Sequence, residues 1–350
     1  MVSVGVGSSK TYDVVPLDEV SLNRVGNMMS EGELDSVPHS KFGFTWEDED
    51  ASTLKWRPQG LTTTVSTSKK EFVAVSWYGR SEADYSDRGA RISFVNIQDS
   101  LESNSSSVKY RHVLLVDENY NTFPGMHAGG LACAGDKYIH VPDSRSGTKK
   151  VYTFSTSNIQ YIPSSDRDAF YDYAYVMPRV GSYDVPITPS FMSYDSSRSK
   201  FLVGTFYQCS SYHEDTSECL VDSNDTFTWY SAGAASSTTP TCQPFFSEMQ
   251  GAVSSTVDGK FLVWCSSSYG SGHDSHLHIA TLLNDQCNAS SSVSKQYRTV
   301  TYPPGLEDLH RSVSSSRYVD YLWGLTEFGS NDGTGNTRRV FSMDLGELMP

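Results

Sequence analysis

The sequence predicts an all-β protein built as a β-propeller, in which four-stranded blades surround a central channel. The composition is typical of strands and turns, because aromatic residues make up 12% of the chain and charged residues only 19%. Short apolar strand patterns follow one another without long helical heptads. Most informative, one strand-entry pattern recurs about every 60 residues, as expected for propeller blades.

The recurring entry is a short polar stretch, then a small or turn residue, then an apolar strand. It occurs as RPQGLTTTV, HAGGLACAG, TPSFMSYDS, MQGAVSSTV and LEDLHRSVS, which begin at residues 57, 127, 188, 249 and 306. A second strand pattern follows each entry, at 71–79, 137–143, 200–208, 260–270 and 321–329. Third patterns lie at 90–97, 149–155, 276–283 and 338–345, and fourth patterns at 110–117, 172–178 and 297–304.

These units favour five blades over residues 57–350, although further strands in 19–56 or 155–187 would make six or seven. The last unit ends near its third strand. We therefore expect an N-terminal strand, TYDVVPLD at 11–18, to complete it and to cover an open sheet edge. Residues 1–56 then form an N-terminal segment of one overall domain. A two-sheet sandwich also contains many short strands, but it would not repeat its entries at so even a step.

The charge pattern excludes two classes of partner. The net charge is −14 and no run of Lys or Arg occurs, so the sequence offers no basic face for nucleic acid. No window approaches 18 apolar residues, so we expect no membrane-spanning helix. We expect a monomer.

The six cysteines form no C-x-x-C pair, which favours disulfides in an oxidising compartment over zinc sites. The expected pairs are Cys209–Cys219 and Cys265–Cys287. Three N-x-S/T sequons agree with this compartment, at Asn104, Asn224 and Asn288. The first residues lack the apolar region of a signal peptide, so we interpret Met1 as an added start on a secreted, extracellular protein.

The repeat also nominates a site. In a propeller, the entries to the inner strands and the loops after the second strands open on one face, around the channel. The entries contribute Arg57, Gln59, His127, Ser190, Gln250, Glu307 and Asp308. The loops contribute Tyr78, Arg80, Arg145, Tyr207, Tyr269 and Glu327.

These residue types suit β-elimination from a uronic acid. Arg80 and Arg145 would neutralise the uronate carboxylate, which makes its C5 proton more acidic. His127 would remove that proton, and Tyr207 would protonate the leaving oxygen. The remaining candidates would bind substrate: Arg57, Gln59, Tyr78, Gln250, Tyr269, Glu307 and Asp308. This chemistry requires no cofactor.

Two other functions stay open. A glycoside hydrolase needs two carboxylates across the scissile bond, but the first entry carries Gln59 and the acids Glu307, Asp308 and Glu327 come late. A lectin would repeat similar residues in each blade, whereas these residues differ from blade to blade, which favours a single enzymatic site. A purely structural interpretation is also open, in which His127 caps a carbonyl and the acids bond backbone N–H groups of a neighbouring blade.

Histidines also cluster at GSGHDSHLHIA, residues 270–280, where His276 and His278 share a strand face after His273. No acidic companion is evident, so we favour ordinary strand residues over a metal site. A structural calcium ion in the channel, held by carbonyl and carboxylate oxygens, is compatible with the sequence.

The motifs PQGLT, SWYGR, RISFV, YRHVLLV, HAGGL, MQGAV and LEDL with LWGLTE span residues 57–345. They resemble a family of secreted fungal and actinobacterial propeller proteins. The resemblance implies a polysaccharide lyase that removes L-rhamnose α-1,4-linked to glucuronic acid, as on gum arabic and other arabinogalactans. It also implies His, Arg and Tyr in the active site and an anionic plant or microbial polysaccharide as the partner, and it makes seven blades possible as well as the five counted above.

Overall fold

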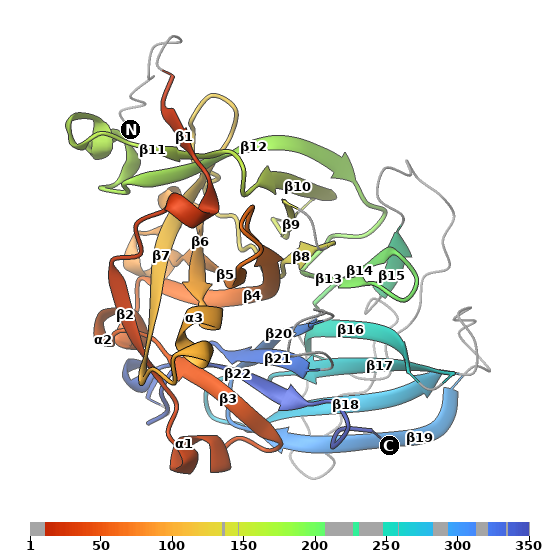
Figure 1. The fold of residues 1–350 in the computed structure, drawn as a ribbon. Helices are drawn as coiled ribbons and strands as arrows, with labels where there is room; N and C mark the ends of the chain where they lie inside the picture. Colours follow the sequence, from red (N-terminus) through yellow and green to blue (C-terminus); the bar gives the residue numbers. More distant parts are fainter. Residues whose placement is uncertain are drawn as a thin grey trace.

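Five inner strands form a closed ring (Figure 1). They are β4 (Trp56–Val65), β8 (Ala132–Cys133), β13 (Phe191–Asp195), β16 (Met249–Val257) and β20 (Leu306–Arg311). Each contacts the next, and β20 contacts β4. The computed structural model describes residues 11–134, 137–145, 147–206, 227–230, 248–257, 259–282, 293–312, 321–333 and 335–349.

Each inner strand starts an antiparallel sheet in which successive strands pair, which is the blade of a propeller. The first blade continues through β5 (Glu71–Gly79), β6 (Ala90–Asn96) and β7 (Ser107–Val116). The second continues through β9 (Tyr138–Asp143), β10 (Lys150–Ser155) and β12 (Tyr175–Asp184). The third includes β14 (Lys200–Gly204) and β15 (Phe227–Tyr230), and the fourth β17 (Lys260–Ser267), β18 (Ser275–Leu282) and β19 (Val293–Tyr302). The protein is therefore an all-β propeller with five blades, as predicted.

An N-terminal strand closes the fifth blade, but it is not the predicted one. β3 (Ser40–Thr45) pairs antiparallel with β22 (Arg339–Asp344), which itself follows β21 (Tyr321–Thr326). The predicted segment 11–18 instead contains β1 (Asp13–Val15), which pairs with β11 (Ile159–Tyr161) of the second blade. Burial explains the choice, because the ring of Phe44 on β3 is fully buried whereas the side chain of Val14 on β1 is 55% exposed.

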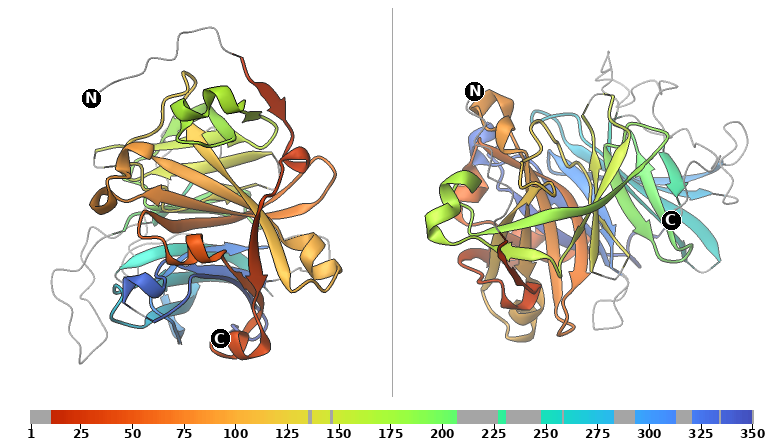
Figure 2. Two further views of the ribbon diagram at one scale, coloured as in Figure 1. Left: turned by 90° about the vertical axis from the view of Figure 1, so that its left-hand side faces the viewer. Right: turned by 90° about the horizontal axis from the view of Figure 1, so that it is seen from above.

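The rest of the N-terminal segment runs along the outside of the sheets, where Figure 2 shows it in red. β2 (Arg24–Met28) pairs with both β3 and β7 and so joins the fifth blade to the first. The α-helices are single turns: α1 (Glu31–Asp35), α2 (Asp48–Ser52) and α3 (Ile97–Glu102). The 3₁₀ turns are η1 (Leu17–Glu19), η2 (Ser81–Ala83), η3 (Ser86–Arg88), η4 (Ser164–Phe170) and η5 (Ser330–Asp332).

Glycines let the inner strands approach one another. A Cβ atom on Gly60 would lie 2.5 Å from the carbonyl carbon of Gly130. A Cβ atom on Gly251 would lie 2.6 Å from Cα of Asp308 in the next blade. These neighbours are backbone atoms that cannot rotate away, so the repeated glycine of the entry pattern is a packing requirement.

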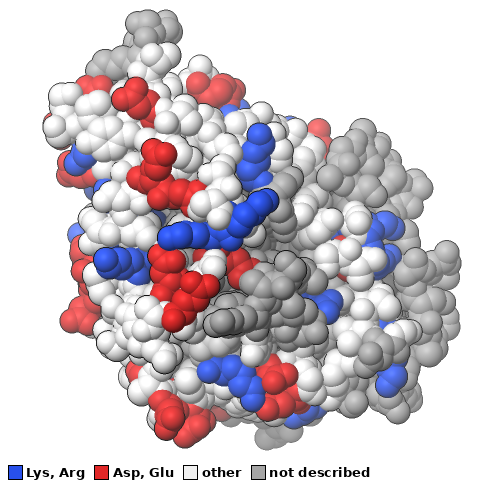
Figure 3. Space-filling model, viewed as in Figure 1, with Lys and Arg blue, Asp and Glu red and all other residues white. Residues whose placement is uncertain are grey.

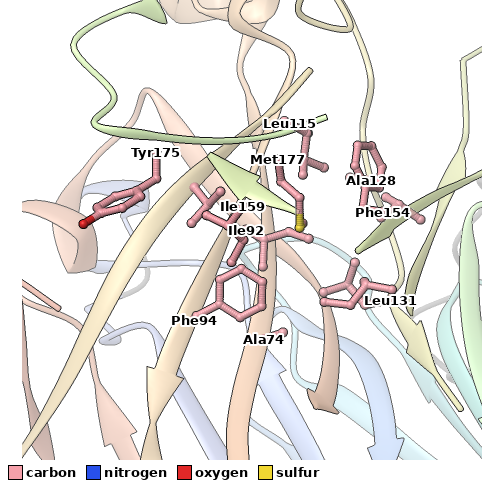
Figure 4. Close-up of a cluster of buried hydrophobic side chains, with 14 of the residues drawn as sticks. Ala74, Ile92, Phe94, Leu115, Ala128, Leu131, Phe154, Ile159, Tyr175 and Met177 are labelled. Carbon is pink, nitrogen blue, oxygen red and sulfur yellow. The ribbon is translucent and has the colours of Figure 1, made fainter. Parts of the chain in front are cut away.

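Apolar side chains fill the space between neighbouring blades. Figure 4 shows such a cluster, in which Ile92 and Phe94 of the first blade meet Phe154 and Met177 of the second. All four are fully buried. Alternate residues of each strand therefore face an adjoining sheet rather than solvent.

The carboxylate of Asp50 ties α2 to the outside of the first blade. It accepts hydrogen bonds from Tyr110 Oη at 2.6 Å, His112 Nε2 at 2.9 Å, Arg91 Nη2 at 3.0 Å and Arg24 Nη1 at 3.1 Å. These donors hold the pKa of Asp50 well below its usual range, despite its burial. The N-terminal segment is thus fixed by a buried charge network as well as by strand pairing.

The cysteines correct one prediction. Cys265 is a free, buried thiol, whose pKa burial raises to about 12, so the expected Cys265–Cys287 pair is wrong. Cys209, Cys219 and Cys287 lie outside the described residues. No disulfide is present in the part of the chain that the structure describes. The thiol of Cys265 lies in the interior of the fourth blade, where it packs as a small apolar residue.

We expect Gly251→Ala to lower the free energy of unfolding by about 1–3 kcal/mol or more, because the added methyl group has no space in the ring. Chemical denaturation would measure this loss. Gly272→Ala is the matched control, since a Cβ atom there meets nothing within 4 Å. Equal stability of the two variants would show that the inner strands do not pack as closely as described.

Buried histidines predict a loss of stability in acid. Burial lowers the pKa of His112 to about 4 and those of His278 and His310 to about 3. Their usual pKa is near 6.5, so from about pH 6.5 down to 4 the unfolded chain binds protons that the native chain excludes. Each such histidine contributes stability that is present above pH 6.5 and lost as the pH falls.

Glu307 and Asp308 have raised pKa values and act in the opposite direction, so the informative quantity is a difference between variants. Over this pH range the wild type should lose about 1.4 kcal/mol more per pH unit than His310→Gln. Denaturation midpoints at several pH values would measure it. Parallel pH curves for the two proteins would contradict the buried, neutral state of His310.

Candidate functional site

A cavity of about 350 Å³ lies where the inner strands begin. Its walls come from all five blades: Gln59, His127, Gly129, Ser144, Thr188, Ser190, Thr205, Phe206, Gln250, Glu307 and Glu327. The predicted convergence of the entries on one site is thereby observed for Gln59, His127, Ser190, Gln250 and Glu307. No lysine or arginine is among these wall residues.

His127 is held in one orientation by two neighbours. Its ring stacks on Tyr78 with centroids 4.0 Å apart, and its Nε2 lies 2.7 Å from Gln59 Oε1. Gln59 Nε2 donates to the carbonyl oxygen of Pro58 at 3.1 Å, which leaves Oε1 facing the imidazole. Since Oε1 can only accept, Nε2 of His127 carries the proton and Nδ1 carries the lone pair.

The environment keeps His127 neutral. Burial, with a contribution from the positive charge of Arg57, lowers the pKa of His127 to about 4. No residue in the described part of the chain hydrogen-bonds its Nδ1. His127 is therefore an unprotonated base in the wall of the cavity at neutral pH.

Glu307 and Glu327 form a carboxyl pair. Their side chains lie within hydrogen-bonding reach of each other, and such a contact between two carboxyl groups requires a proton on one of them. Burial, followed by the negative charge of Glu327, raises the pKa of Glu307 well above its usual range. Burial also raises the pKa of Glu327, against the opposing effect of Arg57. The pair behaves as two coupled acids that share one proton.

Two buried polar atoms of the cavity wall have no hydrogen-bond partner among the residues that the structure describes. They are Glu307 Oε1 and Ser144 Oγ. Buried polar atoms without partners are uncommon in folded proteins, because each costs about 1–3 kcal/mol. Their position in the wall is consistent with a ligand that carries hydroxyl or other polar groups.

Arg57 lies behind the carboxyl pair rather than in the cavity wall. Its Nη1 is 3.2 Å from Glu327 Oε1 and its Nη2 is 2.5 Å from Asp332 Oδ1, while the guanidinium lies 4.8 Å from the centre of the Phe328 ring. Its charge is therefore shared between two carboxylates. Arg57 is placed to adjust the cavity's electrostatics rather than to bind a ligand directly.

Asp308 has a structural position. Its Oδ2 accepts backbone N–H groups of Leu61 at 2.9 Å and of Leu131 at 3.1 Å, which belong to the first and second blades. Burial raises its pKa, and these N–H groups oppose that effect. Asp308 therefore bonds backbone N–H groups of other blades, as the purely structural interpretation expects, whereas Glu307 lines the cavity.

The structure does not bring the two predicted arginines into the cavity wall. Arg145 is bound by Asp143, with Nη2 2.6 Å from Oδ2, and Arg80 Nη1 donates to the carbonyl oxygen of Leu54 at 3.4 Å. Tyr269 packs its ring 5.8 Å from that of His276, also outside the wall. Tyr207 lies outside the described residues.

The sequence pattern does not indicate the wall residues Ser144, Thr188, Thr205 and Phe206 or, behind them, Asp332. Thr205 and Phe206 immediately precede the predicted Tyr207, so the loop was correctly placed but its members were not. Asp332 follows the fifth blade's second strand, in a turn that no repeat pattern aligns.

A Ser-His-Asp chain occurs elsewhere in the first blade. Ser93 Oγ lies 2.8 Å from His112 Nδ1, and His112 Nε2 lies 2.9 Å from Asp50 Oδ2. By residue type this resembles a hydrolytic triad. The side chain of Ser93 is fully buried, however, so no substrate can reach the hydroxyl. The chain is part of the structural network around Asp50.

No metal centre is found among the residues that the structure describes, where no three His, Cys, Asp or Glu side chains form a group suited to an ion. His278 Nδ1 lies 3.1 Å from Thr299 Oγ1, which is an ordinary cross-strand contact. Of the described helices, none is long and apolar enough to cross a membrane. On the face seen in Figure 3, acidic and basic side chains are interspersed.

Comparison with known proteins does not identify a family. No family model matches the chain, and no curated protein matches it. Matching solved structures include a chain of hydrazine synthase from Kuenenia stuttgartiensis, at 13% identity and TM-score 0.34, covering 82% of this chain and 67% of that one.

A chain of the mitotic checkpoint complex matches at 7% identity and TM-score 0.40, covering 97% and 98% of the two chains. A protein of unknown function from Bacteroides thetaiotaomicron VPI-5482 matches at 11% identity and TM-score 0.35, covering 96% and 74%. At these scores the matches carry no argument about function.

We expect Asp308→Ala to destabilise the propeller by about 1–3 kcal/mol or more, because it leaves two buried backbone N–H groups unpaired. Thermal or chemical unfolding would measure the change. Asp184→Ala is a suitable control, since that side chain is 80% exposed and pairs with Lys150 at the surface. A variant of Asp308 as stable as the control would remove its structural role.

Proposed function

We propose that the cavity binds an acidic sugar residue and that His127 removes a proton from it in a β-elimination that breaks a glycosidic bond. The observation that carries this proposal is the neutral His127, whose Nδ1 is not hydrogen-bonded by any described residue, in a wall that also holds the carboxyl of Glu307 with its raised pKa. A base and an acid with opposite pKa shifts in one cavity are typical of proton-transfer catalysis.

The carboxyl geometry argues against hydrolysis. The two carboxyls of a glycosidase stand about 5 Å or more apart, on either side of the scissile bond. Glu307 and Glu327 lie within hydrogen-bonding reach of each other, and Asp308 accepts hydrogen bonds from backbone N–H groups. The described residues therefore supply no second, separate carboxylate to the cavity.

Neutral donors can replace the arginines that the sequence suggested. The side-chain amides of Gln59 and Gln250 line the cavity. Hydrogen bonds from such donors to a uronate carboxylate are charge-assisted, and they strengthen as negative charge moves onto that carboxylate during proton removal. They would thus stabilise the enolate-like transition state more than the bound substrate.

The proposed elimination takes all its protons and electrons from the substrate and the protein. The C5 proton moves to Nδ1 of His127, its electron pair forms the C4–C5 double bond, and the C4–O bond breaks. The leaving oxygen takes a proton, for which Tyr207 remains the predicted donor, next in sequence to the wall residue Phe206. A bound carboxylate raises the pKa of His127 and so makes it a stronger base when substrate is present.

The substrate class that we propose is an anionic plant or microbial polysaccharide, with rhamnosyl-α-1,4-glucuronate on arabinogalactan as the specific form suggested by the motifs. A secreted, extracellular protein fits that substrate. The sequon residue Asn104 is exposed, as a glycosylated residue must be.

We expect His127→Ala to reduce the elimination rate roughly 10²–10⁴-fold, because it removes the base. The ultraviolet absorbance of the unsaturated uronate product would measure the rate on uronate-containing polysaccharides. His140→Ala is the control, because His140 lies on β9 beside Thr153 and outside the cavity wall.

Three outcomes would contradict the proposal. Near-normal elimination by His127→Ala would remove its role as the base. New reducing ends without the ultraviolet product would indicate a hydrolase. Stoichiometric sugar binding without any cleavage by the wild type would indicate a lectin.

A further inference from the structure

We propose that Asp332 and Arg338 are positioning residues, which fix Arg57 against the cavity and thereby set whether the Glu307–Glu327 pair keeps its shared proton. The inference deepens the proposed function and rests on it only for the use that the enzyme makes of this proton. Neither residue lines the cavity.

The carboxylates of Asp332 and Glu327 compete for the guanidinium of Arg57. Arg57 donates through Nη2 to Asp332 Oδ1 at 2.5 Å and approaches Glu327 Oε1 through Nη1 at 3.2 Å. The shorter, stronger contact is therefore with Asp332 and not with the cavity residue. Because Arg57 also pairs with Asp332, it stabilises the ionised form of Glu327 less than it would if Glu327 were its only partner.

Two hydrogen bonds hold the carboxylate of Asp332 in place. Its Oδ2 accepts the backbone N–H of Gly329 at 2.9 Å and Nη2 of Arg338 at 3.3 Å. Arg338 is fully buried, and burial lowers its pKa to about 10. Its Nε donates to the carbonyl oxygen of Glu327 at 2.7 Å, so the same side chain holds both the competing carboxylate and the backbone of the cavity residue.

Two further hydrogen bonds link this loop to the N-terminal segment. Arg338 Nη1 donates to the carbonyl oxygen of Asp50 at 2.8 Å, and Asn331 Nδ2 donates to that of Ser52, also at 2.8 Å. Both acceptors belong to α2, which the Asp50 carboxylate fixes to the first blade. Helix α2 thus serves as the fixed support for the loop that carries Glu327 and Asp332.

Among the described residues, the charged and titratable groups that act on the pair are Arg57, Tyr78, Asp308, Asp332 and Arg338, and His127 lines the same cavity. Removing the negative charge of Asp332 leaves Arg57 to Glu327 and favours loss of the shared proton. Removing the positive charge of Arg338 favours retention of the shared proton. Asp332 then attracts Arg57 more strongly, and Glu327 loses a nearby cation.

The test is an infrared titration of the protonated carboxyl in the intact protein, which needs no substrate. The carbonyl band of the shared acid is assigned as the band that Glu307→Gln removes from the wild-type spectrum. In Asp332→Asn its titration midpoint should fall by about one pH unit or more. In Arg338→Gln it should rise, and Asp332→Glu should restore the wild-type midpoint.

Asp143→Asn is the matched control, because it breaks an Arg–Asp pair of the same kind in the second blade and should leave the band unchanged. An unchanged midpoint in Asp332→Asn, or shifts of the same sign in Asp332→Asn and Arg338→Gln, would overturn the inference. If one of these two variants does not fold, the sign of the midpoint shift in the other variant decides whether the inference holds. Expected shifts in a protein that lacks elimination activity would uphold this inference and reject only the proposed function.

Discussion

The close approach of the inner strands determines both the packing of the propeller and the position of its cavity. Where Gly60 meets Gly130, and Gly251 meets Asp308, no space remains for a side chain, so the backbones of neighbouring blades are almost in contact. Buried backbone N–H groups in such a place need a hydrogen-bond acceptor. Asp308 satisfies two of them from two other blades, and its carboxylate therefore belongs to the architecture.

The same closeness creates the chemistry of the cavity. Side chains at the beginnings of the inner strands converge from every blade, so Gln59, His127 and Glu307 meet although they are far apart in sequence. Their burial favours neutral forms, which gives a base with a lowered pKa and an acid with a raised one. Arg57 prevents the carboxyl pair from being wholly neutral, and its own position depends on groups outside the cavity.

The sequence predicted the blades well because each strand has a local signature that recurs at a near-constant step. It failed where the deciding contact was not local. Residues 11–18 and 40–45 both have strand patterns, but only β3 presents a phenylalanine that the fifth blade can bury. Likewise, the arginines Arg80 and Arg145 occupy loops of the expected kind, yet their partners Leu54 and Asp143 hold them elsewhere, and no spacing in the sequence reveals such pairing.

The proposed chemistry depends on a neutral His127 with its proton on Nε2, and nuclear magnetic resonance of the imidazole nitrogens measures both properties. A ¹⁵N–¹H correlation spectrum, assigned with His127→Ala, reports both the tautomer and the titration of the ring. The predicted result at neutral pH is a neutral imidazole with its proton on Nε2, titrating at about pH 4. A proton on Nδ1, or a charged ring at neutral pH, would contradict it.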